Sequence, residues 1–204
     1  MSQAFDLLAA DYDDDHHDAV AAALIELVDP TPVDRRVADV ACGTGAVALT
    51  LARSRSSADP AVLAVDVSAA MIAAGRARAE RQAAPGAIDW RVADAVPLPC
   101  ADRALDLVLC ASSLHFLGGR ALADWRRALR PGGRVGYSLP LASGFRASGR
   151  FASLVARDLP LPVTARDAAD LAVASGLHAP VARVVRIGDR SVVLIVARTP
   201  GAAL

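Results

Sequence analysis

The sequence predicts an α/β fold: a seven-stranded, mostly parallel sheet with helices on both faces and a C-terminal antiparallel hairpin. Five short apolar runs, each with the length of a buried strand, alternate with alanine- and arginine-rich segments of helical character. Two β-branched runs separated by a short turn follow near the C-terminal end. Repeated strand–helix–strand units imply right-handed crossovers and a parallel sheet covered on both sides.

The elements follow in a regular order along the chain. Apolar residues recur at helical spacing from Val20 to Val28, and Pro30 ends that helix. The five strand-like runs are residues 37–41, 62–67, 88–93, 105–111 and 134–139, and the helical segments between them are residues 46–55, 69–84 and 120–130. Residues 164–175 predict a helix with an N-cap threonine. The hairpin strands are residues 181–187 and 191–197, joined by Gly188, Asp189 and Arg190.

Length and composition limit the organisation and the partners. With 204 residues, 54% of them hydrophobic, the chain can bury one core, so we expect a single domain over residues 1–204. Basic and acidic residues both number 22, so no positive field favours nucleic acid. The three cysteines form no CxxC spacing, the N-terminal region is acidic, and no apolar run reaches membrane-spanning length. We expect a cytoplasmic protein that is a monomer or homodimer and has no membrane partner.

A glycine turn follows the first predicted strand and opens the next helix. Its sequence is Asp39-Val40-Ala41-Cys42-Gly43-Thr44-Gly45. Gly43 and Gly45 give backbone freedom and lack side chains, so a ligand can approach the main chain there. The helix start adds free N–H groups and a positive dipole end. The alternatives are a turn without a ligand and an Asp39 carboxylate satisfied by local backbone groups.

Asp66 ends the second predicted strand and should lie beside the glycine turn. Its two oxygens could accept hydrogen bonds from both hydroxyls of a ribose. The stretch from Gly43 to Ala48 also fits a loose G-x-G-x-x-A pattern, so an NAD(P)-dependent oxidoreductase remains an alternative at this point.

Several ordered motifs together resemble the class I S-adenosylmethionine-dependent methyltransferases, in the small-molecule branch related to the quinone-biosynthesis enzymes. They are VADVACGTG at residues 37–45, Asp94-Ala95 after the third strand, and the stretches 98–108 and 129–135. The resemblance implies a Rossmann-like sheet, S-adenosylmethionine as cofactor, and methyl transfer to O, N, S or C of a small-molecule acceptor. A cyclase and a non-catalytic partner with the same fold are further alternatives.

The resemblance also implies roles for individual residues. The donor's methionine part would be surrounded by Asp39, Ala41, Gly43 and Gly45, and its ribose would be held by Asp66. The adenine would meet Val67, Met71, Asp94 and Ala95, and Tyr12 would cover the donor. Met71 could instead belong to the core and Asp94 could simply begin a turn. Asp106 and the Pro131-Gly132-Gly133 turn are expected to serve the fold.

The acceptor is expected beside the donor, between three segments. Its walls would be an N-terminal lid helix within residues 1–32, residues 112–116, and a short insertion at residues 140–162. His115 is the one candidate catalytic base, and a structural role is equally open. We expect no metal site, because His16 and Ala22 occupy the glycine and glutamate positions of a calcium loop and the adjacent His16 and His17 side chains diverge on a helix.

Overall fold

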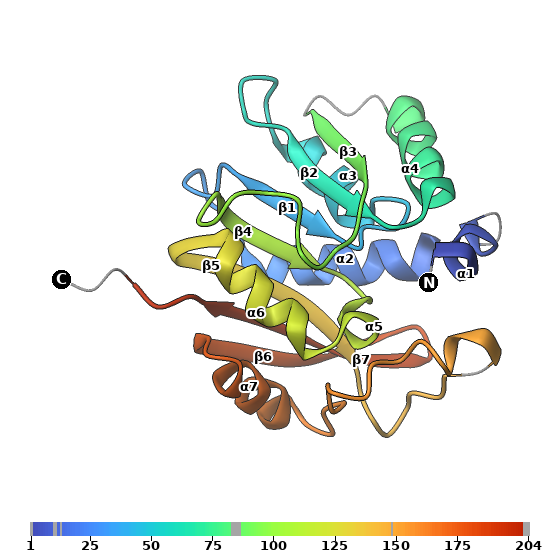
Figure 1. Ribbon diagram of the computed structural model, residues 1–204, viewed down its shortest axis with the longest axis vertical. Coiled ribbons are helices and arrows are strands. Elements are labelled where there is room, and N and C mark those ends of the chain that lie inside the picture. Colours follow the sequence, from blue (N-terminus) through green and yellow to red (C-terminus); the bar gives the residue numbers. More distant parts are fainter. Residues whose placement is uncertain (1, 10–11, 13, 83–86, 148, 202–204) are drawn as a thin grey trace.

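A seven-stranded sheet runs through the molecule in the computed structural model, which describes residues 2–9, 12, 14–82, 87–147 and 149–201 (Figure 1). The strand order is β3-β2-β1-β4-β5-β7-β6. Neighbouring strands from β3 to β5 are parallel, whereas β7 is antiparallel to both β5 and β6. The bounds are β1 (Val37–Val40), β2 (Val62–Asp66), β3 (Ile88–Val92), β4 (Leu105–Cys110), β5 (Leu129–Pro140), β6 (His178–Ile187) and β7 (Arg190–Arg198). The predicted fold class is confirmed.

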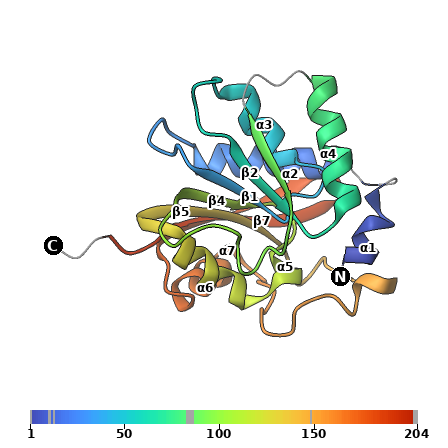
Figure 2. The same ribbon diagram turned by 45° about the horizontal axis from the view of Figure 1, so that its top comes forward.

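The main helices cover the two faces of this sheet (Figures 1 and 2). One face carries α2 (Asp14–Val28), α3 (Ala46–Ser54) and α4 (Ala69–Gln82), and the other carries α5 (Leu114–Leu117), α6 (Gly119–Ala128) and α7 (Ala165–Ala174). The short helix α1 (Ser2–Asp6) contacts α4, and a 3-10 turn, η2 (Gly149–Phe151), lies in the segment after β5. The opposite placement of α3 and α6 follows from right-handed crossovers that run outward from β1 in two directions.

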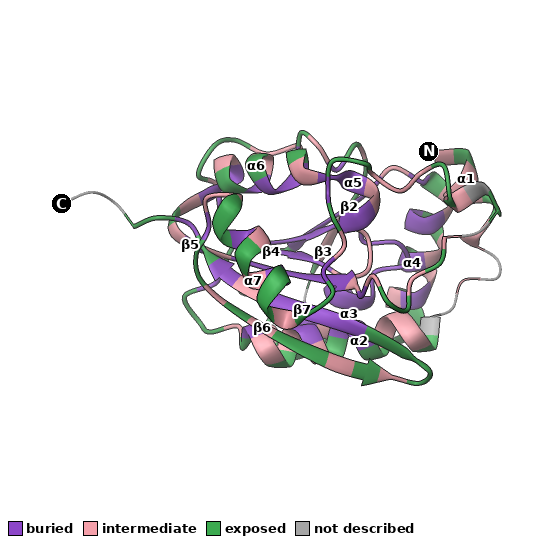
Figure 3. Cartoon of the chain, turned by 90° about the horizontal axis from the view of Figure 1, so that it is seen from below, coloured by how far each residue is buried: buried purple, intermediate pink, exposed green. Residues whose placement is uncertain are grey.

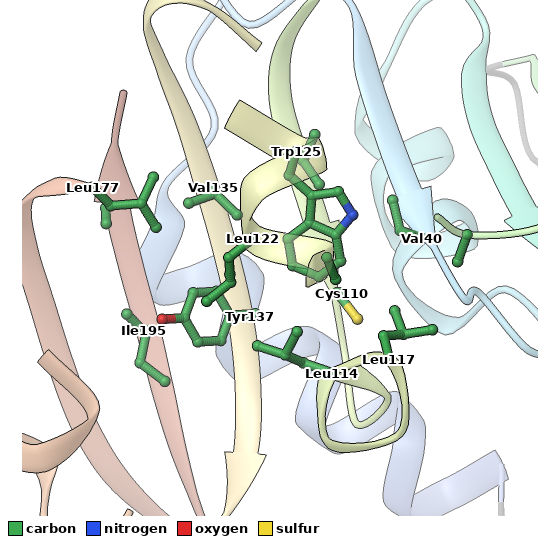
Figure 4. Close-up of a cluster of buried hydrophobic side chains, with 14 of the residues drawn as sticks. Val40, Cys110, Leu114, Leu117, Leu122, Trp125, Val135, Tyr137, Leu177 and Ile195 are labelled. Atoms are coloured by element: carbon green, nitrogen blue, oxygen red, sulfur yellow. The ribbon is translucent and has the colours of Figure 1, made fainter. Parts of the chain in front are cut away.

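The strands alternate between two hydrophobic cores because successive side chains point to opposite faces. In β1, Val40 packs into the core under α6, whereas Val37 packs into the core under α2 and α3. Figure 4 shows the core under α6, where Trp125 and Tyr137 are both fully buried. Strands β1 and β2 are buried throughout, while every residue of the outer strand β6 is exposed or partly exposed (Figure 3).

Strand β5 begins earlier than the sequence predicts. Leu105 pairs with Leu129, but Leu107 pairs with Arg134, so the Pro131-Gly132-Gly133 segment forms an irregularity within the strand instead of a turn before it. Gly132 adopts φ +73°, and its N–H donates to the Pro200 carbonyl at 2.9 Å. The chain after β7 therefore contacts the irregular part of β5.

The predicted features of the C-terminal third are confirmed. Thr164 caps α7: its hydroxyl accepts from the Asp167 N–H at 3.2 Å, and the Asp167 carboxylate accepts from the Thr164 N–H at 2.9 Å. The β6–β7 hairpin closes between Ile187 and Arg190, where Gly188 adopts φ +61°.

The N-terminal region divides into two helices where we expected one lid helix within residues 1–32. Helix α2 belongs to the core, because Val20, Ala21 and Leu24 are fully buried against the sheet. Among the described N-terminal residues, α1 and Tyr12 remain as a possible cover of the site. Asp11 and Asp13 of the acidic N-terminal region lie outside the described residues. The segment at 140–162 contains η2 and turns, and its Ala142 N–H donates to the Pro162 carbonyl at 2.9 Å.

Candidate functional site

The glycine turn lies at the carboxyl end of β1, between the ends of β2 and β4. Parallel strands of such a sheet bring their carboxyl ends to one edge, where ligands of these folds bind. Ala41, Gly43 and Gly45 adopt φ values of +52°, +55° and +85°. A left-handed conformation is strained for alanine, so Ala41 stores strain at this edge. Ser112, at the end of β4, has φ +64° as well.

Asp66 joins the end of β2 to the glycine turn. Its carboxylate accepts from the Gly43 N–H and from the Ser68 N–H, both at 2.8 Å. The side chain is 7% exposed, and burial raises its pKa, although the backbone hydrogen bonds act in the opposite direction. The acid therefore lies where the sequence predicts it, against the backbone that the glycines leave open.

Asp39 is a second buried acid beneath the same turn. It is 1% exposed and accepts from the Ala48 N–H in the first turn of α3 at 2.9 Å. Burial raises the pKa of Asp39 to about 7, and the nearby charge of Asp66 adds to this rise. In the described part of the chain, no ion pair joins either acid to a basic side chain, so the edge favours a ligand that carries positive charge.

Two aromatic residues enclose the glycine turn. A Cβ atom at Gly43 would lie 3.1 Å from the hydroxyl oxygen of Tyr12, and the Tyr12 ring stacks on His17 with centroids 4.5 Å apart. A Cβ atom at Gly45 would lie 2.3 Å from Trp90 on β3, and one at Gly75 would lie 2.6 Å from the same ring. Tyr12 therefore lies over the glycine turn, and its role as a cover of the donor stays a prediction, whereas Trp90 was not predicted.

A buried arginine links the glycine turn to the N-terminal region. Arg78 on α4 is 8% exposed, donates to the Thr44 hydroxyl at 3.0 Å, and pairs with Asp18 on α2 at 2.7 Å. The hydroxyl of Ser68 donates to Asp6 of α1 at 2.6 Å. None of these three contacts was predicted, since the partners are 34 to 62 positions apart in the chain.

The four predicted adenine residues lie after β2 and β3. Met71 is 1% exposed and Ala95 is 7% exposed, whereas Val67 is half-buried and Asp94 is exposed. The burial of Met71 agrees with a core position as well as with an adenine contact. The adenine role of these residues stays a prediction.

His115 is the second residue of α5 and lies among aromatic rings. It is 6% exposed, and its Nδ1 atom has no hydrogen-bond partner among the described residues. Burial, together with the charge of His17, lowers the pKa of His115 to about 4, so the imidazole is neutral at pH 7. A base of that strength is far from the pKa near 7 that suits general-base catalysis at neutral pH.

The three expected acceptor walls meet at this histidine. Phe5 of α1 lies 5.7 Å from Phe116 of α5 and 5.6 Å from Phe151 of η2, measured between ring centroids. The Ala156 N–H of the segment 140–162 donates to the His115 carbonyl at 2.9 Å. The N-terminal region, α5 and the segment 140–162 therefore lie side by side at the carboxyl edge.

Other features of the described residues lie away from the glycine turn or serve the fold. A surface hollow of about 630 Å³ lies at the start of β5, away from both acids, and includes Arg103, Arg126 and Arg127 in its lining. No described group of three or more His, Cys, Asp or Glu side chains could hold a metal ion. None of the described helices has the length and apolar character needed to cross a membrane. Asp106 serves the fold, because its carboxylate accepts from the Arg36 N–H and pairs with Arg130.

Comparisons with known proteins agree on the type of domain. The family described as "Methyltransferase domain" matches residues 37–133. The ubiquinone/menaquinone biosynthesis C-methyltransferase UbiE of Acidiphilium cryptum is 40% identical over 112 residues, which are 54% of this chain and 43% of that protein. The chain thus spans less than half the length of that curated relative.

Two solved structures share the fold. An S-adenosylmethionine-dependent methyltransferase from Thermotoga maritima aligns with a TM-score of 0.71 over 98% of this chain and 100% of its own, at 17% identity. The [4+2]-cyclase SpnF aligns with a TM-score of 0.68 over 91% of this chain and 81% of its own, at 21% identity. At such identities the likeness concerns the fold alone and does not separate a transferase from a cyclase.

Proposed function

We propose that this chain, whose residues 37–133 match the family described as "Methyltransferase domain", transfers a methyl group from S-adenosylmethionine to O, N, S or C of a small-molecule acceptor. Carbon is the first atom to test, because the curated relative is named a C-methyltransferase.

The residues at the carboxyl edge fit this donor. Asp39 and the Ala41 carbonyl would receive its ammonium group, and Asp66 would receive its ribose hydroxyls. Both acids accept from backbone N–H groups in the structure, and a carboxylate has room for about four hydrogen bonds, so each can accept more. The raised pKa of Asp39 reflects a buried acid without a cationic neighbour, which a positively charged donor would supply.

One observation carries the proposal. The Asp66 carboxylate accepts from the backbone N–H of Gly43. Gly43 adopts a left-handed conformation with φ +55°, and the Tyr12 hydroxyl lies over it. Glycine backbone, buried acid and aromatic cover thus meet at the edge where this sheet type binds nucleosides. A turn that served the fold alone would need neither the buried acid nor the cover.

The chain's own residues mainly position the reactants. When bound, the donor supplies a methyl group that is already activated on a sulfonium. Asp39, Asp66 and the glycine turn would fix the donor, Tyr12 would exclude water from it, and α5 would set the acceptor in line. Well-oriented reactants can gain effective molarities of about 10⁵–10⁸ M, so positioning can provide most of the acceleration.

Ligand-dependent melting of the whole chain tests the proposal. S-adenosylmethionine and S-adenosylhomocysteine at about 100 times their dissociation constants should each add about 2.7 kcal/mol of stability, whereas NAD and NADP should add none. Binding of NAD with no binding of either sulfur compound would overturn the proposal in favour of an oxidoreductase. Donor binding with no methyl transfer to any acceptor would instead point to a cyclase or a non-catalytic partner.

The proposal includes the expected cytoplasmic location and a monomer or homodimer as the solution state. The three cysteines are free thiols, which suits a reducing compartment. Light scattering of the purified chain decides between the two oligomeric states.

A further inference from the structure

Helix α4 contacts the middle of the glycine turn at two positions that lie one helical turn apart. A Cβ atom at Gly75 would lie 3.1 Å from the Thr44 carbonyl oxygen, so the missing side chain lets the helix approach the backbone of the turn. Three residues later, on the same face of the helix, Arg78 donates to the Thr44 hydroxyl at 3.0 Å. Thr44 is 2% exposed and joins Gly43 to Gly45, so α4 holds the residue between the two glycines.

The same guanidinium also reaches the N-terminal region. A second nitrogen of Arg78 pairs with Asp18 of α2 at 2.7 Å. His17, the residue before Asp18, stacks on the Tyr12 ring with centroids 4.5 Å apart. The Tyr12 hydroxyl oxygen in turn lies 3.1 Å from the position of a Cβ atom at Gly43. This series of contacts leaves the glycine turn through Arg78 and returns to it through Tyr12.

Burial makes arginine a costly residue for packing alone. The side chain of Arg78 is 10% exposed, whereas that of its partner Asp18 is 44% exposed. The arginine therefore loses most of its hydration for a carboxylate that is still in contact with water. Such a pair adds little net stability, because the loss of hydration offsets most of the attraction between the charges. The geometry that the guanidinium imposes on its partners is then its main effect.

We propose that Arg78 is a positioning residue for donor binding. Through Thr44 it holds the glycine turn in the conformation that receives the methionine part of the donor. Through Asp18 it holds the start of α2, and with it the Tyr12 ring, over that turn. This inference rests on the proposed function, in which the glycine turn surrounds the methionine part. A guanidinium suits the task because its nitrogens diverge from one rigid plane and can serve two partners at once, whereas a lysine ammonium is a single point charge.

Two ligands separate this role from a general effect on the fold. S-adenosylhomocysteine and 5′-methylthioadenosine share the adenosine and the sulfur, but only the first has the amino-acid part. In calorimetry on the whole chain, Arg78→Met should weaken binding of S-adenosylhomocysteine about tenfold and that of 5′-methylthioadenosine less than about twofold. Arg78→Lys should recover part of the loss, to about threefold, because the ammonium can serve one partner but not both.

A matched control lies on the same helix. Arg81 is an exposed arginine of α4, three residues after Arg78. Arg81→Met removes the same charge and adds the same side chain as Arg78→Met, and it should change neither affinity. A loss of S-adenosylhomocysteine binding in Arg81→Met equal to that in Arg78→Met would reduce the effect to the charge of the helix and overturn the proposal.

Double variants test the two routes from the guanidinium. Thr44→Val and Asp18→Ala should each weaken S-adenosylhomocysteine binding several-fold. Neither should weaken it further in protein that already carries Arg78→Met, because each acts through a contact that this variant has removed. Losses that multiply in both double variants would show that Arg78 acts on neither partner, which overturns the proposal.

The melting temperature of the ligand-free variants distinguishes positioning from folding. Arg78→Met should melt within about 3 °C of the parent chain. A much lower melting temperature with equal losses for both ligands would make Arg78 a structural residue and overturn the inference. If the methionine variant does not fold, Arg78→Lys decides, since it must still weaken S-adenosylhomocysteine binding more than 5′-methylthioadenosine binding. Failure of the parent chain to bind S-adenosylhomocysteine would overturn the proposed function, whereas binding that is the same in the parent and in all Arg78 variants refutes this inference alone.

Discussion

Donor affinity should fall steeply as the pH is lowered from 7 to 5, because Asp39 must be ionised to receive the donor's ammonium group. Burial raises the pKa of Asp39 to about 7 in the free protein. About half of the molecules are then ionised at pH 7 and about one in a hundred at pH 5. Apparent affinity scales with the competent fraction, so the dissociation constant should rise about 50-fold over these two pH units.

Isothermal titration with S-adenosylhomocysteine between pH 5 and pH 8 measures this dependence. The bound state holds the ionised form, so binding below pH 7 should release a proton and the heat should vary with the buffer. Asp39→Asn is the matched control, because the amide oxygen can still accept from the Ala48 N–H that Asp39 bonds at 2.9 Å. An affinity that is constant from pH 5 to 7, or an equal pH dependence in Asp39→Asn, would refute this role of Asp39.

Four substitutions give further tests. Asp66→Ala should weaken donor binding by about 2 kcal/mol, since buried hydroxyls lose a charged acceptor, and unchanged affinity in calorimetry would make Asp66 structural. Gly45→Ala should destabilise the fold by about 3 kcal/mol in urea unfolding, because its Cβ would lie 2.3 Å from Trp90 at a φ of +85°. Ala41→Gly should stabilise the fold by about 1 kcal/mol in the same assay, since it relieves the strain at φ +52°, and a loss of stability would contradict that reading. His115→Ala should slow single-turnover methyl transfer by less than about 10²-fold, and a larger loss with donor affinity intact would make it a catalytic base.

Local sequence patterns were enough to predict most of the fold and the position of the glycine turn and Asp66. The period of the apolar residues distinguished strands from helices, and the glycine turn and Asp66 were recognisable because each follows directly from the end of a strand. Thr164 was recognisable because a helix cap is a local contact, here with Asp167 three residues further on. The structure brings the predicted turn and Asp66 into direct hydrogen bonding.

The features that were missed depend on partners far apart in the chain. Arg78 is one arginine among many on alanine-rich helices, and only the fold reveals its contact with Thr44. The irregular start of β5 is hydrogen-bonded to Pro200, which lies beyond the next two strands. The four phenylalanines are scattered over about 150 positions, so no window of the sequence could have shown that two of them contact His115 and the other two contact Phe116.

The two tryptophans give the molecule a pair of optical probes with different surroundings. Trp125 is fully buried in the core under α6, so its emission should be blue-shifted and insensitive to ligands. Trp90 is partly exposed and fills the space between Gly45, at the start of α3, and Gly75, within α4. A Trp125→Phe variant would therefore carry a single fluorophore at the glycine turn, and movements of that turn could be followed in real time without any label.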